Sequence, residues 1–200
     1  MARNRRQFRR PLGTRRYRKL FVLAVEGNTT EPQYFAIFND QHSVIYVDCL
    51  KGKHRSAPTQ VLKRMRGRLQ QEALRDSDSA WLVVDKDSWT VDQLNQLHTW
   101  SQERENYGLA LSNPKFEYWL LLHFEEGAGI RTSRACSERL KRYLPNYDKS
   151  INARDFPMTR ILQAVRRARA RDVPPCRDWP RNSGTTVYRL VEKLLREDYE

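Results

Sequence analysis

The chain alternates between short apolar segments and amphipathic helical segments four times in succession, and this repeat limits the folds open to it. The apolar segments have the length and composition of buried strands. They cover residues 20–25, 44–47, 80–84 and 107–111. Each precedes a segment whose apolar residues recur at three- and four-residue spacing, which predicts a helix. These helical segments cover residues 32–39, 58–73, 91–103 and 114–124. Repeated strand and helix indicate right-handed crossovers, and therefore an α/β fold with a mainly parallel four-stranded sheet flanked by helices.

The pattern changes after Gly127, where three further helical segments follow without apolar strands between them. They cover residues 134–144, 157–170 and 184–197, and prolines separate them. Three helices with few large apolar side chains would be marginally stable alone. We therefore predict a tail at residues 1–19, an α/β core at 20–127, and a helical extension at 128–200 that packs on the core.

Positive charge is concentrated at the N-terminus. The chain has 37 Lys and Arg against 24 Asp and Glu, a net charge of +13, and nine of these cations lie in residues 1–19, which contain no acid. So few apolar groups predict a tail that stays disordered until an anion binds it. Nucleic acid is the expected partner, although a ribosomal or membrane surface would attract the tail equally. The candidate nucleic-acid contacts are Arg9, Arg10, Arg15 and Arg16 in the tail, and Lys53 and Arg55 in the body.

The sequence argues against membrane and secreted proteins. No apolar run approaches the roughly 18 residues that cross a bilayer, and the arginine-rich start lacks the apolar stretch of a signal peptide. The three cysteines, Cys49, Cys136 and Cys176, are widely spaced and form no Cys-x-x-Cys pair. This spacing suggests neither a disulfide framework nor a zinc site, and we expect a cytoplasmic protein.

Acidic residues follow three of the four predicted strands. Glu26 comes after the first strand, Asp85 and Asp87 after the third, and Glu117 lies about one helical turn beyond the fourth. Ligands of open parallel sheets bind beyond the carboxyl ends of the strands, where these residues should meet. Two carboxylates about 4 Å apart repel by roughly 4 kcal/mol at an effective dielectric of about 20, so a cation is expected among them.

The predicted cation is Mg²⁺ or Mn²⁺, held by Glu26, Asp85 and Asp87. Oxygen ligands without His or Cys suit these hard ions and disfavour zinc. The alternative for Asp-x-Asp after a strand is turn chemistry, in which Asp bonds its own backbone. Glu26, after a different strand, favours the metal interpretation.

Three further residues near these acids have both a functional and a structural interpretation. Glu31 precedes Pro32 and should cap a helix that starts at the proline, either as a site carboxylate or as a favourable anion at a helix N-terminus. Asn113 before Pro114 is expected to be a structural cap. His123, at the far end of the predicted helix, is interpreted as a packed core histidine, and a functional role stays open.

Four separated motifs in the chain resemble those of the RloB family. They are residues 26–35 (EGNTTEPQYF), 83–87 (VVDKD), 112–124 (SNPKFEYWLLLHF) and 184–188 (GTTVY). The resemblance runs from about residue 19 to 195. It implies a Toprim-like Rossmannoid core, because Toprim domains of topoisomerases, primases and some nucleases carry a Glu after the first strand and Asp-x-Asp after the third. Lys115 departs from the small residue or Cys expected there, and adds a cation that could contact phosphate.

The resemblance implies a Mg²⁺-dependent nuclease of RNA, plausibly tRNA, or of DNA, which acts in phage defence with an ATPase partner. Glu26, Asp85, Asp87, Glu31 and Glu117 are the candidate catalytic residues. The main alternative is a non-catalytic nucleic-acid-binding or adaptor protein. Nucleotidyl transfer, as in primases, is a third hypothesis, whereas strand passage would need a much larger scaffold.

Overall fold

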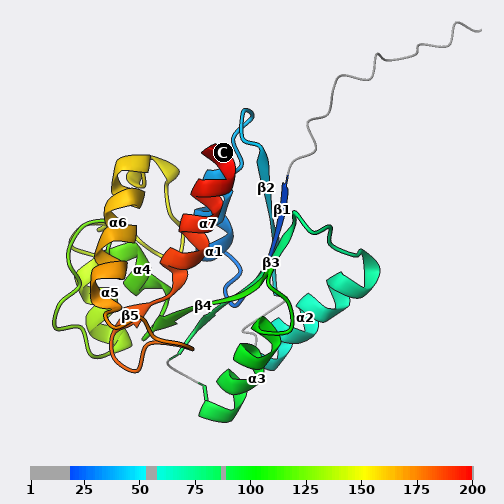
Figure 1. Cartoon of the computed structure of the whole chain (residues 1–200). Helices are drawn as coiled ribbons and strands as arrows, with labels where there is room; N and C mark the ends of the chain where they lie inside the picture. The colour runs from blue at the N-terminus through cyan, green and yellow to red at the C-terminus, as the bar shows by residue number, and fades with distance from the viewer. Residues whose placement is uncertain (1–18, 53–57, 87–88, 200) are drawn as a thin grey trace, which may run out of the picture.

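The computed structural model describes residues 19–52, 58–86 and 89–199. Within them the chain forms a five-stranded sheet in the order β2-β1-β3-β4-β5 (Figure 1). The strands are β1 (Lys19–Val25), β2 (Ile45–Leu50), β3 (Ser79–Asp85), β4 (Tyr107–Asn113) and β5 (Gly184–Thr185). The mainly parallel α/β sheet is confirmed, because β1 to β4 pair in parallel. The predicted number of four strands is wrong, since β5 pairs antiparallel with β4 and its two residues carry no strand pattern.

Helices flank the sheet on both faces, as the repeat predicted. They are α1 (Thr30–Phe35), α2 (Pro58–Gln71), α3 (Val91–Ser101), α4 (Phe116–Leu121), α5 (Ser133–Leu140), α6 (Met158–Arg171) and α7 (Val187–Tyr199), with short 3₁₀ turns at Ala36–Phe38 and Ala153–Asp155. The helix predicted at 114–124 is much shorter than expected, because Lys115 is extended and precedes α4. After Leu121 the chain continues in turns, in which the His123 backbone N–H donates to Leu120 O at 3.2 Å.

Alternation along the strands sorts the core into two layers. In β1, Phe21, Leu23 and Val25 pack with α1, α4 and the C-terminal helices, whereas Val22 and Ala24 pack with α2 and α3. Figure 1 shows these two groups of helices on opposite faces of the sheet. Successive strand residues point to opposite faces, so both faces of the parallel sheet are apolar. The sheet is therefore buried between two helical layers.

The C-terminal helices share the core of the sheet. The layer that contains Phe21 of β1 and Trp119 of α4 also contains Ile161 of α6 and Leu194 of α7, all of them buried. At the amino end of the sheet, Asp198 of α7 accepts hydrogen bonds from the Val44 backbone N–H at 2.9 Å and from a nearby serine. These contacts tie the end of the chain to the strands that begin it.

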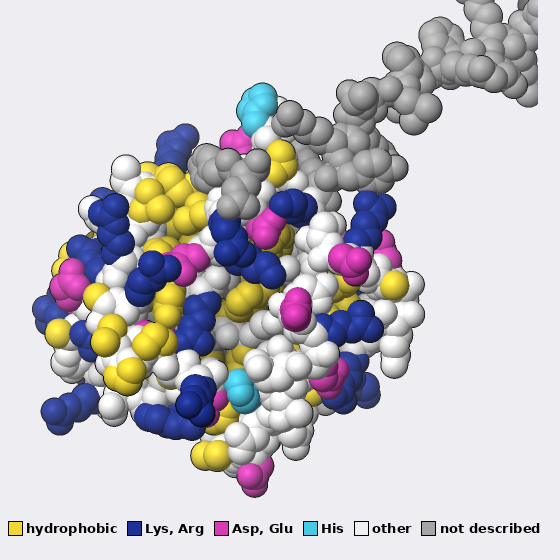
Figure 2. Space-filling view, viewed as in Figure 1, with side chains coloured by type: hydrophobic (Ala, Val, Ile, Leu, Met, Phe, Trp, Pro, Cys, Tyr) yellow, Lys and Arg dark blue, Asp and Glu magenta, His cyan; other side chains and the backbone are white. Residues whose placement is uncertain are grey.

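The surface of the described residues carries many positively and many negatively charged side chains (Figure 2). Figure 2 shows Lys and Arg side chains spread over the face formed by α5, α6 and α7, with acidic side chains among them. None of the helices in residues 19–52, 58–86 and 89–199 combines the length and apolar character that crossing a membrane requires.

A close approach between β3 and β4 makes Gly108 sensitive to substitution. Trp81 lies level with Gly108, and a Cβ at Gly108 would meet the indole ring at 2.5 Å. We expect Gly108→Ala to lower the free energy of unfolding by about 1–3 kcal/mol, because the buried ring must shift. Urea denaturation measures this change.

Gly67 of α2 provides the matched control, because a Cβ there has nothing within 4 Å. Gly67→Ala should raise the free energy of unfolding by about 0.5–1 kcal/mol. Equal stability of Gly108→Ala and the wild type would contradict the packing described for Trp81.

Candidate functional site

The carboxyl ends of β1 and β3 bring two of the predicted acids together. Glu26 follows β1, and its backbone N–H donates to Val83 O at 3.0 Å, which extends the pairing with β3 by one residue. Its carboxylate Oε2 accepts the Asp85 backbone N–H at 3.1 Å and the Trp89 indole N–H at 3.2 Å. Glu26 is thus held against the end of β3 by hydrogen bonds that fix the direction of its side chain.

Asp85, the last residue of β3, is held from the other side. Its Oδ1 accepts the backbone N–H of Phe116, the first residue of α4, at 2.7 Å. Asp85 alternates with Val83 and so faces the α4 layer, whereas Glu26 bonds to Trp89, which packs in the α2 and α3 layer. The two acids therefore meet at the rim from opposite faces of the sheet.

Several predicted site residues lie outside the described residues. They are the third predicted metal ligand, Asp87, and the candidate nucleic-acid contacts Lys53, Arg55, Arg9, Arg10, Arg15 and Arg16. Within the described segments, no three Asp, Glu, His or Cys side chains are grouped closely enough to hold a metal ion. The three-ligand arrangement stays a prediction, because one of its members is not described.

Glu31 and Glu117 form a buried pair of acids next to this rim, with exposed fractions of 6% and 3%. Glu31 does not cap α1 as predicted: the helix starts at Thr30, and Glu31 lies in its first turn. The proline that follows fits there because first-turn backbone N–H groups need no partner within the helix. Glu31 Oε1 instead accepts the Gly27 backbone N–H at 3.0 Å, and a side chain at Gly27 would collide with this carboxylate.

The two buried acids have opposite pKa shifts. Burial raises the pKa of Glu31. Hydrogen bonds from backbone N–H groups oppose this shift without cancelling it, and the nearby Glu117 adds a smaller increase. Burial alone would also raise the pKa of Glu117, but the hydrogen bond and charge of Lys149 hold it below its ordinary value. One carboxyl is thus biased toward its neutral form and the other toward its charged form, as in sites that combine acid and base chemistry.

Lys149 is the site residue that the sequence analysis missed. Its ammonium bonds to Glu117 Oε1, and Tyr147 O–H donates to the same oxygen at 3.1 Å. Its backbone has φ of +64°, an uncommon conformation for a residue with a side chain, and its carbonyl accepts the Thr30 hydroxyl at 2.6 Å. No periodicity marks the loop between α5 and α6, so only the fold reveals that Lys149 belongs to the site.

Lys149 connects the buried pair to the rim. Burial alone would lower its pKa, but Glu117, Asp85 and Glu31 together raise it above its ordinary value. Lys115 adds a second cation: its ammonium lies 3.9 Å from Glu117 Oε1 and donates to Ser137 Oγ at 2.6 Å. For the buried pair, lysines of the chain supply the positive charge that the clustered acids require.

Two residues with structural interpretations have clear positions. Asn113 is not a helix cap, since β4 ends there and Lys115 precedes α4; its side-chain amide donates to Pro180 O and Arg181 O at 3.0 Å. His123 is confirmed as a core residue: it is 1% exposed, and its Nε2 lies 3.0 Å from the Tyr34 hydroxyl. Burial lowers the pKa of His123 to about 3, so the ring is neutral at pH 7.

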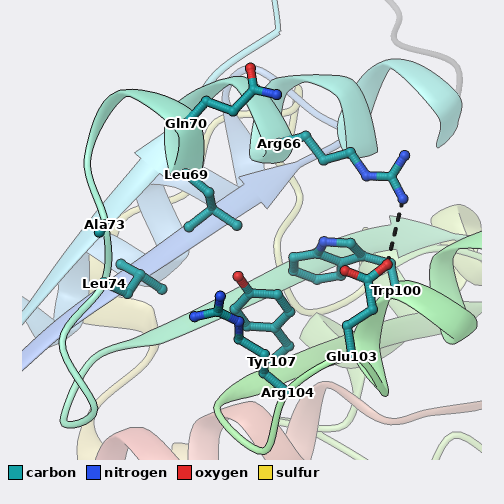
Figure 3. A pocket seen from close by; sticks show the side chains of 9 residues that line it. All are labelled: Arg66, Leu69, Gln70, Ala73, Leu74, Trp100, Glu103, Arg104 and Tyr107. Carbon is teal, nitrogen blue, oxygen red and sulfur yellow. Dashed lines mark ion pairs between the residues drawn. The ribbon is translucent and has the colours of Figure 1, made fainter.

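A pocket lies at the other end of the sheet, near the amino end of β4. It is lined by α2, α3 and the start of β4, where Trp100 stacks on Tyr107 with ring centroids 4.5 Å apart (Figure 3). Arg66 forms an ion pair with Glu103 across it, at 3.6 Å (Figure 3). Tyr107 begins β4, so this pocket is separated from the acids by the length of a strand.

A family model described as RloB-like protein matches residues 21–194, nearly the whole described chain. The chain belongs to the RloB-like family. The match includes Glu26, Glu31, Asp85, Glu117 and Lys149, and it ends within α7. No curated protein and no solved structure matches the chain.

The buried His123 predicts a pH-dependent stability. The unfolded chain binds a proton near pH 6.5 and the folded chain only near pH 3, so the free energy of unfolding should fall as pH drops through this window, by about 1.4 kcal/mol per unit. Between pH 6.5 and 4.5 this contribution is about 2 kcal/mol. His123→Gln should show a shallower dependence in urea denaturation, and parallel profiles would contradict a neutral buried ring.

The Lys149–Glu117 ion pair gives a separate stability prediction. Lys149→Met should lower the free energy of unfolding at pH 7 by about 1 kcal/mol, a modest value because the lysine side chain is 64% exposed and partly screened. The depressed pKa of Glu117 contributes stability above its ordinary value near 4.5, which is lost as pH falls through the folded value.

The difference between Lys149→Met and the wild type should therefore shrink below about pH 4.5 in urea denaturation. Lys141→Met, at an exposed lysine after α5, is the matched control and should leave stability within about 0.5 kcal/mol. A constant difference at all pH values would show that Lys149 acts through packing alone.

Proposed function

We propose that this RloB-like protein is a metal-dependent nuclease whose active site is the rim at the carboxyl ends of β1 and β3. The observation that carries the proposal is the contact between Glu26 and Asp85: acids from two neighbouring parallel strands are linked by the Asp85 N–H bond to Glu26 Oε2. Ligand sites of open parallel sheets lie at this edge. The order of the acids also matches the Toprim pattern that the family resemblance implies.

The donor set at the rim fits Mg²⁺ or Mn²⁺. Glu26 and Asp85 offer carboxylate oxygens, and Asp87 is the third proposed ligand. Cys136 has an electrostatic interaction with Asp85 but is buried, and burial raises its thiol pKa to about 12, so it offers no thiolate. When bound, the ion would neutralise charge on the scissile phosphate and lower the pKa of a bound water.

The residues around the rim have complementary roles in this proposal. The backbone N–H groups of Asp85 and Phe116 orient the two carboxylates before substrate arrives. Glu26 holds the metal or accepts a proton from the attacking water. Burial biases the Glu31 carboxyl toward its neutral form, and Lys149 biases Glu117 toward its charged form. The exposed Lys149 ammonium can meet a substrate phosphate.

The substrate in this proposal is RNA, with tRNA as a plausible target, or DNA. The arginine-rich tail and the basic residues of the body would hold the phosphate backbone, a contact that supplies affinity and salt dependence but little sequence specificity. A role in phage defence with an ATPase partner follows from the family resemblance and is part of the same proposal. The proposed cytoplasmic location rests on the spacing of the three cysteines.

One observation favours a second candidate, a binding or adaptor protein without catalysis. Glu117 is already neutralised by Lys149, and Lys115 lies close by, so the buried acids do not need a metal ion to coexist. In a binding protein these residues would be structural. The two candidates differ in whether a chelator stops the activity.

The test is incubation of the protein with total RNA and with plasmid DNA, with Mg²⁺, Mn²⁺ or EDTA. Cleavage should require the divalent ion, and Asp85→Asn should reduce it at least about 100-fold, because the metal contributes several kcal/mol to the transition state. Asp92→Asn, at an exposed acid in the first turn of α3, is the matched control and should retain full cleavage.

Two outcomes would contradict the proposal. Full cleavage by Asp85→Asn would remove the rim from the mechanism. Salt-sensitive binding of nucleic acid that neither EDTA nor Asp85→Asn alters, together with no cleavage, would identify the adaptor instead.

A separate primer-extension assay tests nucleotidyl transfer. Incorporation of nucleotides into the primer would point to that activity.

A further inference from the structure

A basic cavity opens beside the rim, on the β5 side of the sheet. Its volume is about 610 Å³, within the range of ligand sites. It lies between the ends of β3 and β4, the loop that precedes α5, the last turn of α6 and the loop that leads into β5. Figure 1 shows these segments, far apart in the sequence, converging where β5 meets β4.

Cations from four separate segments line this cavity. They are Lys86, Arg131, Arg171 and Arg181, and none of the described residues that line it is acidic. Arg181 is partly neutralised from outside the cavity, since it forms an ion pair with Asp178 at 2.6 Å. Like charges gathered from four segments repel one another, so this arrangement favours an anionic ligand.

Hydrogen bonds hold the loops that carry two of these cations, Arg131 and Arg181. Asn113 at the end of β4 donates to the Pro180 and Arg181 carbonyls, which ties the loop of Arg181 to the sheet. Ser183 donates from the same loop to the Ile130 carbonyl, next to Arg131. The cavity is therefore built from segments that are bonded to each other. Arginine is suited to such a ligand, because its planar guanidinium can bind two phosphate oxygens at once.

The cavity adjoins the acids through a single peptide bond. Lys86 follows Asp85 directly, and its backbone N–H is shared between Ser112 O at 2.9 Å and Pro114 O at 3.2 Å. Cα atoms of successive residues are about 3.8 Å apart. Lys86, which lines the cavity, is therefore the immediate neighbour of Asp85 at the rim.

We infer that this cavity binds a phosphodiester group of the same nucleic-acid strand, adjacent to the one held at Glu26 and Asp85. The inference rests on the proposed nuclease function and names the part of the chain that positions its substrate. A strand that crosses the end of β3 would place one phosphate at the acids and a neighbouring one among the arginines. Phosphate contacts of this kind set register and affinity, not sequence preference.

The experiment measures binding separately from cleavage. A fluorescein-labelled single-stranded RNA of twelve nucleotides is titrated in EDTA, by fluorescence anisotropy, at several salt concentrations. Arg131→Ala should weaken binding about five-fold, and Lys86→Ala combined with Arg131→Ala should weaken it further. The slope of log K against log salt should fall by about 0.7 for each cation removed.

Arg131 is exposed in a loop, so its replacement should leave the melting temperature unchanged. Arg142→Ala, at an exposed arginine after α5, is the matched control and should leave affinity and salt slope as in the wild type. Weakening by Arg142→Ala equal to that by Arg131→Ala would overturn the inference, because it would show a general charge effect.

Two further measurements identify the ligand of the cavity and distinguish failure of this inference from failure of the proposed nuclease function. Inorganic phosphate and ATP are titrated as competitors; if Arg131→Ala abolishes their binding but leaves RNA binding unchanged, the cavity serves a small anion and the inference is wrong. Weaker RNA binding by Arg131→Ala in a protein that shows no metal-dependent cleavage supports the cavity and rejects the nuclease. If Arg131→Ala leaves RNA binding unchanged while the wild-type protein cleaves RNA, the inference about the cavity is wrong and the nuclease proposal stands.

Discussion

The parallel register of β1, β3 and β4 is the constraint on which the rest of the structure depends. Val25 lies level with Val83, and Asp85 with Ser112, so the carboxyl ends of three strands finish at one edge. The Asp85 N–H can reach Glu26 only in this register. A slip of one residue would turn every side chain of a strand to the other face, which both apolar layers oppose. Core packing therefore positions the acids.

The negative charge near the rim is stabilised in two different ways, one for the buried acids and one for the acids at the solvent edge. Inside the α1 and α4 layer, Glu117 is paired with Lys149, and Glu31 is biased toward its neutral form by burial. An unpaired buried carboxylate would be costly, so Lys149 stabilises the fold whether or not the site is catalytic. At the solvent edge, Glu26 and Asp85 are held by N–H groups, the arrangement on which the proposed metal site is based. Stability and the proposed chemistry thus use neighbouring parts of one network.

The fold could largely be predicted because its signals are local. Apolar runs and helical periodicity indicated β1 to β4 and the helices between them. The failures also have local causes: β5 is too short to show a pattern, and Asn113 looks like a cap although it ends a strand before a cis peptide bond. Glu31 lies within the helix and not before it, because proline is tolerated throughout the first turn of a helix and Pro32 is the third residue of α1.

The sequence by itself determined the layered α/β architecture, the family, and the position of acids after strands, since these follow from periodicity and from motifs within short segments. Only the tertiary structure decided that Lys149 neutralises Glu117, that Glu26 and Asp85 approach from opposite faces, and that cations from four segments surround one cavity. These features join residues as far apart as 30 to 100 positions, and no local pattern encodes such contacts. They arise when packing of the two apolar layers brings loops from distant parts of the chain to one edge of the sheet.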